Sequence, residues 1–384
     1  MLYFLLQPLA RSIKTFNLLN YITFRAGAAF VTALIVAFIV APTIIRRLRA
    51  MAVHQVVREG TPDTHAGKGT TPTMGGLIIL VATFVPLLLW GRYTWHRGGQ
   101  YLVTAMVLTA WMGGIGFLDD YLKLKQKRLG LKNEGLVERY KLVGQLSAGL
   151  ALGLYVWLFP LSTLPGASTT LPFFKYILII PSTAALTWLY IAFVTFVLTG
   201  ASNAVNITDG LDGLASGLVG IAAATFGVFA YMFGRYDTSG YLQVFYLRGA
   251  GELTVFCAAI LGACIGFLWY NTFPAQVFMG DTGSLALGGA LGAVSVLLKS
   301  EFLLLIIGGV FVAEMFSVIL QRFVFKYRKR RHGLEYAQRH RVFLRAPLHH
   351  HFEVKGWPET QVVVRFWIIG IFCAILALST LKLR

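Results

Sequence analysis

Acidic residues that could do chemistry occur in three short segments of this chain. Asp119 and Asp120 are adjacent, Asp209 and Asp212 are three residues apart among glycines, and Asp281 opens an Asp-Thr-Gly-Ser sequence. Adjacent carboxylates repel each other unless a cation neutralises them or one keeps its proton. Oxygen ligands beside a phosphate suit Mg²⁺, which takes one or two carboxylates and keeps some water. Each segment alone has a structural alternative: a solvated helix end, a capped loop, or a turn in which Asp281 caps the next helix.

Two further segments combine groups that bind phosphate. His349, His350 and His351 are consecutive, so they cannot all face one metal ion from regular structure. We expect phosphate contacts or a proton role for one of them, with exposed loop histidines as the alternative. Lys68 begins the sequence KGTTPTMGG, whose lysine, hydroxyls and glycines could cradle a phosphate or form a plain polar linker.

Glu314 is an ionisable residue inside an apolar segment at 302–321. Such a residue in a membrane helix is a candidate functional group by default. A structural hydrogen bond between helices is the alternative.

The composition indicates where these residues must be held. The chain has 384 residues, of which 57% are hydrophobic and 13% are charged. Soluble domains have about 25% charged residues, so this chain has too few charged residues to cover the surface of a soluble protein. We predict an all-α polytopic membrane protein with one domain, residues 1–384. A membrane span needs about 20 mostly apolar residues. Ten segments approach that length: 26–45, 75–90, 101–118, 142–159, 182–199, 214–233, 253–270, 284–298, 302–321 and 362–381.

The basic residues predict the topology. The chain carries 34 Lys and Arg against 16 Asp and Glu, a net charge of +18. Most of the basic residues fall in the loops after the odd-numbered segments, so we expect these loops in the cytoplasm and both termini in the periplasm. The charge then indicates topology and anionic lipid or phosphate partners, not nucleic acid. The expected cytoplasmic loops are 46–74, 119–141, 200–213, 271–283 and 322–361. The five candidate aspartates lie in three of these loops, so we expect them to converge on the same membrane face.

Taken together, these segments resemble the phospho-N-acetylmuramoyl-pentapeptide-transferase family. Its wider superfamily, the polyprenyl-phosphate N-acetylhexosamine-1-phosphate transferases, shares the aspartates. The histidine-rich stretch is the most specific evidence for the muramoyl-pentapeptide branch. The matching motifs span nearly the whole chain: TPTMGG (71–76), GFLDDYLK (116–123), NITDGLDGL (206–214), FMGDTGS (278–284), EMFSVILQ (314–321) and APLHHHFEVKGWPE (346–359).

The resemblance implies a reaction at the cytoplasmic face of a bacterial inner membrane. Undecaprenyl phosphate attacks the β-phosphate of UDP-N-acetylmuramoyl-pentapeptide, UMP leaves and lipid I forms. This is the first membrane step of peptidoglycan synthesis. The resemblance also implies ten membrane helices, a Mg²⁺ requirement and a homodimer.

The resemblance also implies roles for individual residues. Asp281 is expected to be the principal Mg²⁺ ligand, with Asp119 and Asp120 beside it. Asp119 would act as base or orienting group for the lipid phosphate, and His349 would belong to the catalytic group. Phe278 could stack on uracil, and Lys123 with Lys132 could hold the pyrophosphate. The expected substrate contacts are Lys68, Thr73, Lys123, Lys132, Asn206, Asp209, Asp212, Asn271, Phe278, Gln321, His350 and His351.

Two alternatives stay open at this point. A sister transferase that moves N-acetylglucosamine-1-phosphate to a polyprenyl phosphate would share the aspartates but not the histidine-rich stretch. A secondary transporter would place its site near the bilayer midplane, often between repeated halves, and this chain has no visible repeat. One departure from the family is the stretch 326–345, which is longer and more basic than expected. It would grip anionic lipid or extend a surface loop.

Overall fold

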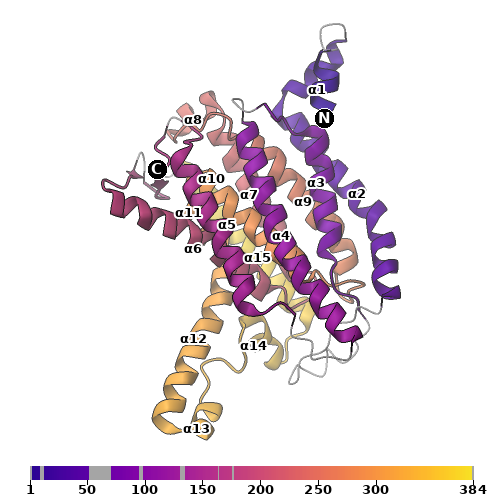
Figure 1. Ribbon diagram of the computed structural model, residues 1–384, viewed down its shortest axis with the longest axis vertical. Helices are drawn as coiled ribbons and strands as arrows, with labels where there is room; N and C mark the ends of the chain where they lie inside the picture. Colours follow the sequence, from indigo (N-terminus) through magenta and orange to yellow (C-terminus); the bar gives the residue numbers. More distant parts are fainter. Residues whose placement is uncertain are drawn as a thin grey trace.

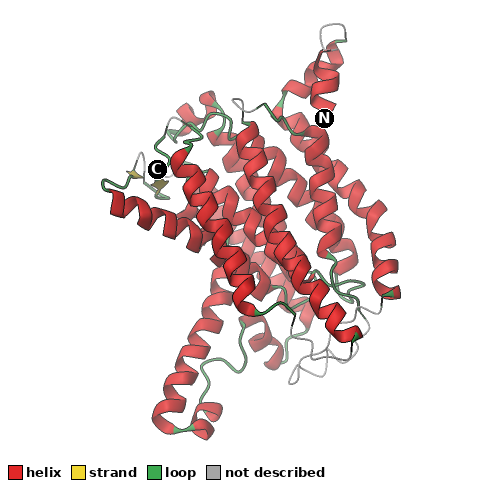
Figure 2. Cartoon of the chain, viewed as in Figure 1, coloured by secondary structure: helices red, strands yellow, loops and turns green. Residues whose placement is uncertain are grey.

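The computed structural model describes residues 2–8, 13–51, 71–94, 98–129, 135–162, 164–174 and 177–382. Lys68 and Lys132 lie outside these ranges, and so does much of the expected loop 46–74. Helices make up nearly all the regular structure in the described ranges (Figure 2), which confirms the predicted all-α class. The exception there is one short antiparallel pair, in which β1 (Thr169–Thr170) aligns with β2 (Leu178–Ile179).

The described residues form a bundle of long helices, with an arm that extends from one end (Figure 1). The helices, together with the 3-10 helix η2 (Lys14–Asn20), are α1 (Leu2–Leu6), α2 (Ile22–Ala50), α3 (Gly76–Trp90), α4 (Gly99–Arg128), α5 (Glu138–Leu158), α6 (Ala184–Thr208), α7 (Leu214–Phe233), α8 (Tyr236–Leu242), α9 (Glu252–Asn271), α10 (Gly280–Leu297), α11 (Glu301–Ile307), α12 (Gly309–His332), α13 (Leu334–Arg339), α14 (Leu348–Val354) and α15 (Glu359–Ser379).

Every one of the ten expected apolar segments is helical, but ten membrane spans are not confirmed. Seven of the described helices are long and apolar enough to cross a membrane: α2, α4, α5, α6, α7, α9 and α15. The bent pair of α11 and α12 would make an eighth. The expected segments 75–90 and 284–298 correspond to α3, which has 15 residues, and to α10, which is not among the seven. Both chain ends lie near the end of the bundle farthest from α13 (Figure 1), and their side of the membrane stays a prediction.

The expected segment 302–321 is not one straight helix. It is divided between α11 and α12, whose axes differ by 86°. The break falls at the adjacent residues Gly308 and Gly309, and glycine pairs are a common cause of sharp kinks. A Cβ at Gly309 would lie 2.9 Å from Cys373 Sγ, so the bend also lets α12 begin in close contact with α15.

Helix α10 lies at the centre of the bundle, where it packs against α3, α4, α6 and α7. All its residues from Thr282 to Leu297 are buried. Membrane helices approach closely through small residues. In α10 a Cβ at Gly288 would lie 2.6 Å from the main chain of α6 at Ser202, which only glycine permits. This packing places the first turn of α10 beside α4 and α6.

Helix α12 continues beyond the bundle, and α13 folds back beside its far end (Figure 1). The last turn of α12 carries four basic residues, 329–332. The exceptionally basic stretch 326–345 therefore occupies the tip of this arm, and α14, which carries the three histidines, follows it in the chain.

Candidate active site

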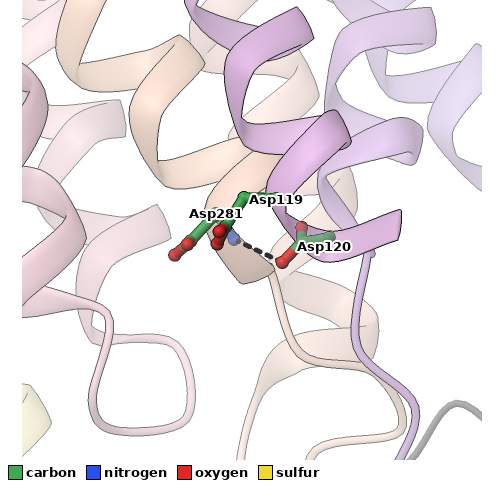
Figure 3. A group of neighbouring side chains, drawn as sticks. All are labelled: Asp119, Asp120 and Asp281. Carbon is green, nitrogen blue, oxygen red and sulfur yellow. Dashed lines mark hydrogen bonds between the residues drawn. The ribbon is translucent and has the colours of Figure 1, made fainter. Parts of the chain in front are cut away.

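The aspartates of two distant segments meet where α4 contacts α10. Oxygens of Asp119, Asp120 and Asp281 all lie within 4.8 Å of one another (Figure 3). Asp119 and Asp120 are buried, with 3% and 6% of their surface exposed. The two helices touch through their main chains, because a Cβ at Gly116 would lie 2.1 Å from the carbonyl oxygen of Asp281. The predicted convergence of these three acids is therefore present in the fold.

Asp120 caps α10 from outside that helix. Its carboxylate accepts hydrogen bonds from the backbone N–H of Asp281 (3.3 Å, the dashed line in Figure 3), from the N–H of Thr282 (2.9 Å) and from the Thr282 hydroxyl (2.6 Å). An acceptor at this place satisfies N–H groups that have no partner within the helix. The structural alternative from the sequence was that Asp281 caps α10. Asp120 caps this helix instead, so the side chain of Asp281 is available for other contacts.

Two lysines neutralise part of the acidic cluster. Lys123 Nζ lies 2.5 Å from Asp119 Oδ2 and 2.9 Å from Asp281 Oδ2. Lys141 Nζ lies 2.7 Å from Asp281 Oδ2 and 3.9 Å from Asp119 Oδ2. Lys123 was among the predicted site residues, whereas Lys141 was counted only as a loop charge. No motif contains Lys141; it reaches the cluster because α5 begins beside α4.

Helix α6 supplies two predicted site residues at its C-terminal end. The amide of Asn206 donates to Asp281 Oδ1 at 2.6 Å and to the Ser284 hydroxyl at 2.8 Å. Asp209 follows the last residue of the helix. Burial, followed by the nearby charges of Asp281, Asp120 and Asp212, raises the pKa of Asp209 to about 8. A carboxyl group in this environment favours a proton or a bound cation.

Asp212 and Asn271 hold the loops that surround the cluster. Asp212 Oδ2 accepts from the backbone N–H of Ala275 at 3.0 Å. Asn271 accepts from the N–H of Gly213 at 3.1 Å and donates to the carbonyl oxygen of Val277 at 3.0 Å. These hydrogen bonds connect the 209–213 turn to the 271–278 segment. Asn271 also accepts from the Ser216 hydroxyl at 3.3 Å, and substrate contacts for Asp212 and Asn271 stay predictions.

Thr73 and Phe278 lie on two segments that pair through their main chains. The N–H of Phe278 donates to the carbonyl oxygen of Pro72 at 2.9 Å, and its own carbonyl oxygen accepts from Gly75 at 2.8 Å. Both side chains are half-buried. The glycines are needed here, because a Cβ at Gly76 would lie 2.1 Å from the backbone nitrogen of Gly283. These contacts place the segment that carries Thr73 beside the N-terminal end of α10.

The three histidines have three different partners, so they do not form one metal site. His349 binds Glu314. The ring of His350 contacts Glu353 at 2.7 Å, and burial lowers the pKa of His350 although that carboxylate opposes the shift. His351 Nδ1 accepts from the N–H of Leu344 at 3.1 Å. Of the three, His349 is the most deeply buried.

Gln321 is occupied by main chain away from the aspartates. It accepts from the N–H groups of Val342 (3.2 Å) and Phe343 (3.0 Å) and donates to the carbonyl oxygen of Phe343 (3.2 Å). These contacts fasten the segment that precedes α14 to α12. The structure therefore gives Gln321 a holding role for the histidine-rich segment, and a nucleotide contact for it stays a prediction.

The donor set fits a hard divalent cation. Asp119 and Asp281 present carboxylate oxygens next to each other, and Mg²⁺ prefers such ligands in small number. The oxygens of Asp120 already accept three hydrogen bonds, so Asp120 fits a supporting position better than a ligand position. The site also holds two cationic side chains, Lys123 and Lys141, which would attract phosphate oxygens.

Comparison with known proteins identifies the family. Residues 102–299 match the model of glycosyl transferase family 4, a range that contains all five aspartates. A phospho-N-acetylmuramoyl-pentapeptide-transferase of Gemmatimonas aurantiaca is 78% identical over 384 residues, which cover 100% of both chains. Proteins of the same name from Geobacter strain M21 and Thermodesulfovibrio yellowstonii are 49% and 47% identical, again over 100% of both chains. The chain therefore belongs to the phospho-N-acetylmuramoyl-pentapeptide-transferase family, as its motifs predicted.

Proposed function

We propose that this protein transfers phospho-N-acetylmuramoyl-pentapeptide from its UDP donor to undecaprenyl phosphate, releasing UMP and forming lipid I. The observation that carries the proposal is the junction of α4 and α10, where Asp119 and Asp281 share two lysines. Full-length similarity to transferases of that name supports the same reaction. A phosphate oxygen of the acceptor would attack the β-phosphorus, and the bond from that phosphorus to the oxygen bridging the two phosphates would break, so that UMP takes the bridging oxygen.

Phosphoryl transfer depends on positioning and charge stabilisation more than on a strong base, and the acceptor here is already an anion. When bound by Asp281 and Asp119, Mg²⁺ would neutralise charge on the phosphates of the donor. Lys123 and Lys141 reach the same carboxylate oxygen of Asp281, so phosphate oxygens placed there would find two ammonium groups. Asn206 fixes the rotamer of Asp281 by donating to its other oxygen. Asp119, paired with Lys123, would orient the acceptor phosphate.

The setting proposed for this reaction is the bacterial inner membrane, with the site facing the cytoplasm. Ten helices would cross the bilayer, both termini would be periplasmic, and the prenyl tail would stay in lipid while its phosphate reaches Asp119. The basic arm, residues 326–345, would lie on anionic lipid, because clustered lysines and arginines bind such surfaces. The protein would act as a homodimer.

The decisive experiment is a purified assay with undecaprenyl phosphate and either of two donors. We expect UMP release with UDP-N-acetylmuramoyl-pentapeptide and none with UDP-N-acetylglucosamine. We expect EDTA to stop the reaction and excess Mg²⁺ to restore it. Turnover of UDP-N-acetylglucosamine alone would identify the sister transferase. Flux into proteoliposomes without UMP release would identify a transporter.

The proposed topology has a separate test by labelling single cysteines in a background without the native cysteines. Leu129→Cys and Thr272→Cys place a thiol at exposed positions on the two segments that flank the acidic cluster. We expect an impermeant maleimide to label both from the cytoplasmic side only. Tyr236→Cys, at a position 80% exposed on α8, is expected to label only from the opposite side. Labelling of Leu129→Cys and Thr272→Cys from different compartments would rule out a shared site.

A further inference from the structure

The carboxylate of Glu314 holds both the main chain and the ring of His349. Glu314 Oε1 accepts from the backbone N–H of His349 at 3.1 Å, and Oε2 lies 3.2 Å from the ring Nδ1. The two side chains are 0% and 1% exposed. Glu314 belongs to the first half of α12 and His349 to α14, so the pair connects α12 to the histidine-rich helix. One carboxylate thus fixes the position of His349 and the direction of its ring.

The other ring nitrogen of His349 points toward the acidic turn that follows α6. Nε2 is buried and has no hydrogen-bond partner among the described residues. A Cβ at Gly210 would lie 2.3 Å from Nε2 and 2.8 Å from Cε1, so the ring edge packs directly against that residue. Gly210 lies between Asp209 and Asp212, and it is itself exposed. The unpartnered nitrogen is therefore directed at a segment that borders the candidate site.

We propose that Glu314 is a positioning residue that holds His349 with its proton on Nδ1, so that Nε2 faces the bound nucleotide sugar as a hydrogen-bond acceptor. The inference rests on the proposed function, and it assigns to Glu314 a role that acts through His349. An ionised carboxylate only accepts hydrogen bonds, so the contact with Oε2 requires the proton on Nδ1.

A purely structural role for Glu314 would be a tie between α12 and α14. The substitution Glu314→Gln separates the two roles. Glutamine keeps the size of the side chain and keeps an acceptor for the backbone N–H of His349, so the tie survives. Its amide group would face Nδ1 as a donor, and the ring would then carry its proton on Nε2.

The kinetic test compares Glu314→Gln with Glu335→Gln, a matched change at a carboxylate on α13 that is 78% exposed. We expect kcat of Glu314→Gln to fall about 10- to 100-fold, the usual effect of removing a group that orients a ligand. The KM for the donor should stay within about twofold, because the proposed contact of Nε2 serves the transfer step rather than the binding of the donor. Glu335→Gln should match the unchanged protein.

A double-substitution cycle tests whether Glu314 acts through His349. We expect the combination of Glu314→Gln and His349→Gln to be no slower than His349→Gln alone. Unchanged kcat in Glu314→Gln, or effects of the two substitutions that multiply, would overturn the proposal.

A spectroscopic readout keeps the inference independent of turnover. In protein labelled with ¹⁵N-histidine, the His349 signals, identified by their loss in His349→Gln, should show a protonated Nδ1. In Glu314→Gln the Nδ1 signal should become that of an unprotonated nitrogen. An unprotonated Nδ1 in the unchanged protein would overturn the inference even if the transferase assay succeeds. Failure of the assay with a protonated Nδ1 would count against the proposed function alone.

A second variant approaches the ring from the other side in case Glu314→Gln does not fold. Gly210→Ala puts a methyl group 2.3 Å from the present position of Nε2, so the ring must move away while Glu314 is untouched. We expect a fall in kcat similar to that of Glu314→Gln, with the thermal midpoint unchanged. Full activity of Gly210→Ala would contradict the placement of Nε2 toward this turn.

Discussion

Two buried clusters of charge lie between helices of this protein, and they are built differently. At one, Arg25 of α2 donates to both oxygens of Glu252 at 2.5 and 2.6 Å, and the two side chains are 1% and 3% exposed. At the other, Asp119 and Asp281 share Lys123 and Lys141 beside Asp120, and Lys123 is 37% exposed. The first cluster has balanced charge and closed geometry. The second has more carboxylates than cations and is open to solvent on one side, which is the arrangement expected of a binding site.

A third cluster follows the pattern of the first. Glu301 accepts from the Thr169 hydroxyl at 2.5 Å and from the Tyr190 hydroxyl at 3.1 Å. Lys299 donates to the carbonyl oxygen of Gly166 and contacts Tyr190. These contacts attach β1 to the link between α10 and α11. Because one acid and one base are each satisfied by neutral partners, we interpret this cluster as structural as well.

The largest expected effect is loss of turnover at the open cluster. Asp281→Ala should lower kcat by about 1,000-fold or more, because it removes the proposed Mg²⁺ ligand and the partner of both lysines at once. Asp119→Asn should also cripple the chemistry, while binding of the nucleotide survives. The measurements are UMP release and binding of UDP to the purified protein. Asp237→Asn, which breaks an exposed ion pair with Arg235, is the control. Near-normal activity of folded Asp281→Ala would remove the basis for assigning it to the metal.

The balanced cluster should show the opposite behaviour. Arg25→Met leaves the buried Glu252 carboxylate without its partner, so the free energy of unfolding should fall by about 3–5 kcal/mol. Turnover per folded molecule should be unchanged. Unfolding by SDS titration measures the first quantity, and active-site titration with a tight nucleotide ligand normalises the second. Adding Glu252→Met should restore part of the lost stability. If Arg25→Met lowered kcat without lowering stability, the interpretation of the Arg25–Glu252 cluster as structural and of the aspartate cluster as functional would be wrong.

Substitution of Lys141, a residue outside every motif, tests whether the cations of the open cluster serve the substrate. Lys141→Met should lower kcat/KM for the donor by about 100-fold, an effect comparable to the loss of one preorganised donor at a developing charge. Lys125→Met, an exposed lysine on α4, should have no effect. Equal activity of the two variants would mean that Lys141 serves only to offset the charge of Asp281 in the absence of substrate.

Much of the helical framework and of the acidic cluster could be predicted, since both depend on simple patterns. Apolar length alone located ten segments that are largely helical, and charge counting alone predicted that five aspartates share one membrane face. The fold brings Asp119, Asp120 and Asp281 together, and Asp209 is close enough to feel the charges of Asp120 and Asp281. The resemblance to the family added the roles of these residues, and those roles stay predictions.

The features that could not be predicted from the sequence depend on how the helices and loops pack. The bend at Gly308 interrupts a segment of continuous hydropathy, so no pattern of apolar residues could reveal it. The hydrogen bonds that Asn271 and Gln321 make to loop main chain could not be predicted, because they depend on the course of the loops, and the substrate contacts expected of both residues stay predictions. The pairing of Glu314 with His349 joins residues 35 positions apart across two helices. The contact is a hydrogen bond between helices, which was one of the two roles that the sequence left open for Glu314.

Asp209 offers the smallest and most specific test of the open cluster. Its pKa is raised from an ordinary value of 3.8 to about 8 in the folded, metal-free protein, chiefly by burial and then by neighbouring carboxylates. Between these values the folded state binds more protons at this group than the unfolded state, so its contribution to stability falls as pH rises. Asp209→Asn removes this penalty, and the thermal midpoint of the metal-free variant should exceed that of the unchanged protein by a few degrees above pH 8. The thermal midpoints of the two proteins should converge as pH falls toward 4.

Mg²⁺ should narrow the difference in thermal midpoint at high pH, because a cation stabilises the ionised carboxyl group of Asp209. A difference that is the same at pH 5 and pH 9 would show that Asp209 does not share the excess negative charge of the cluster.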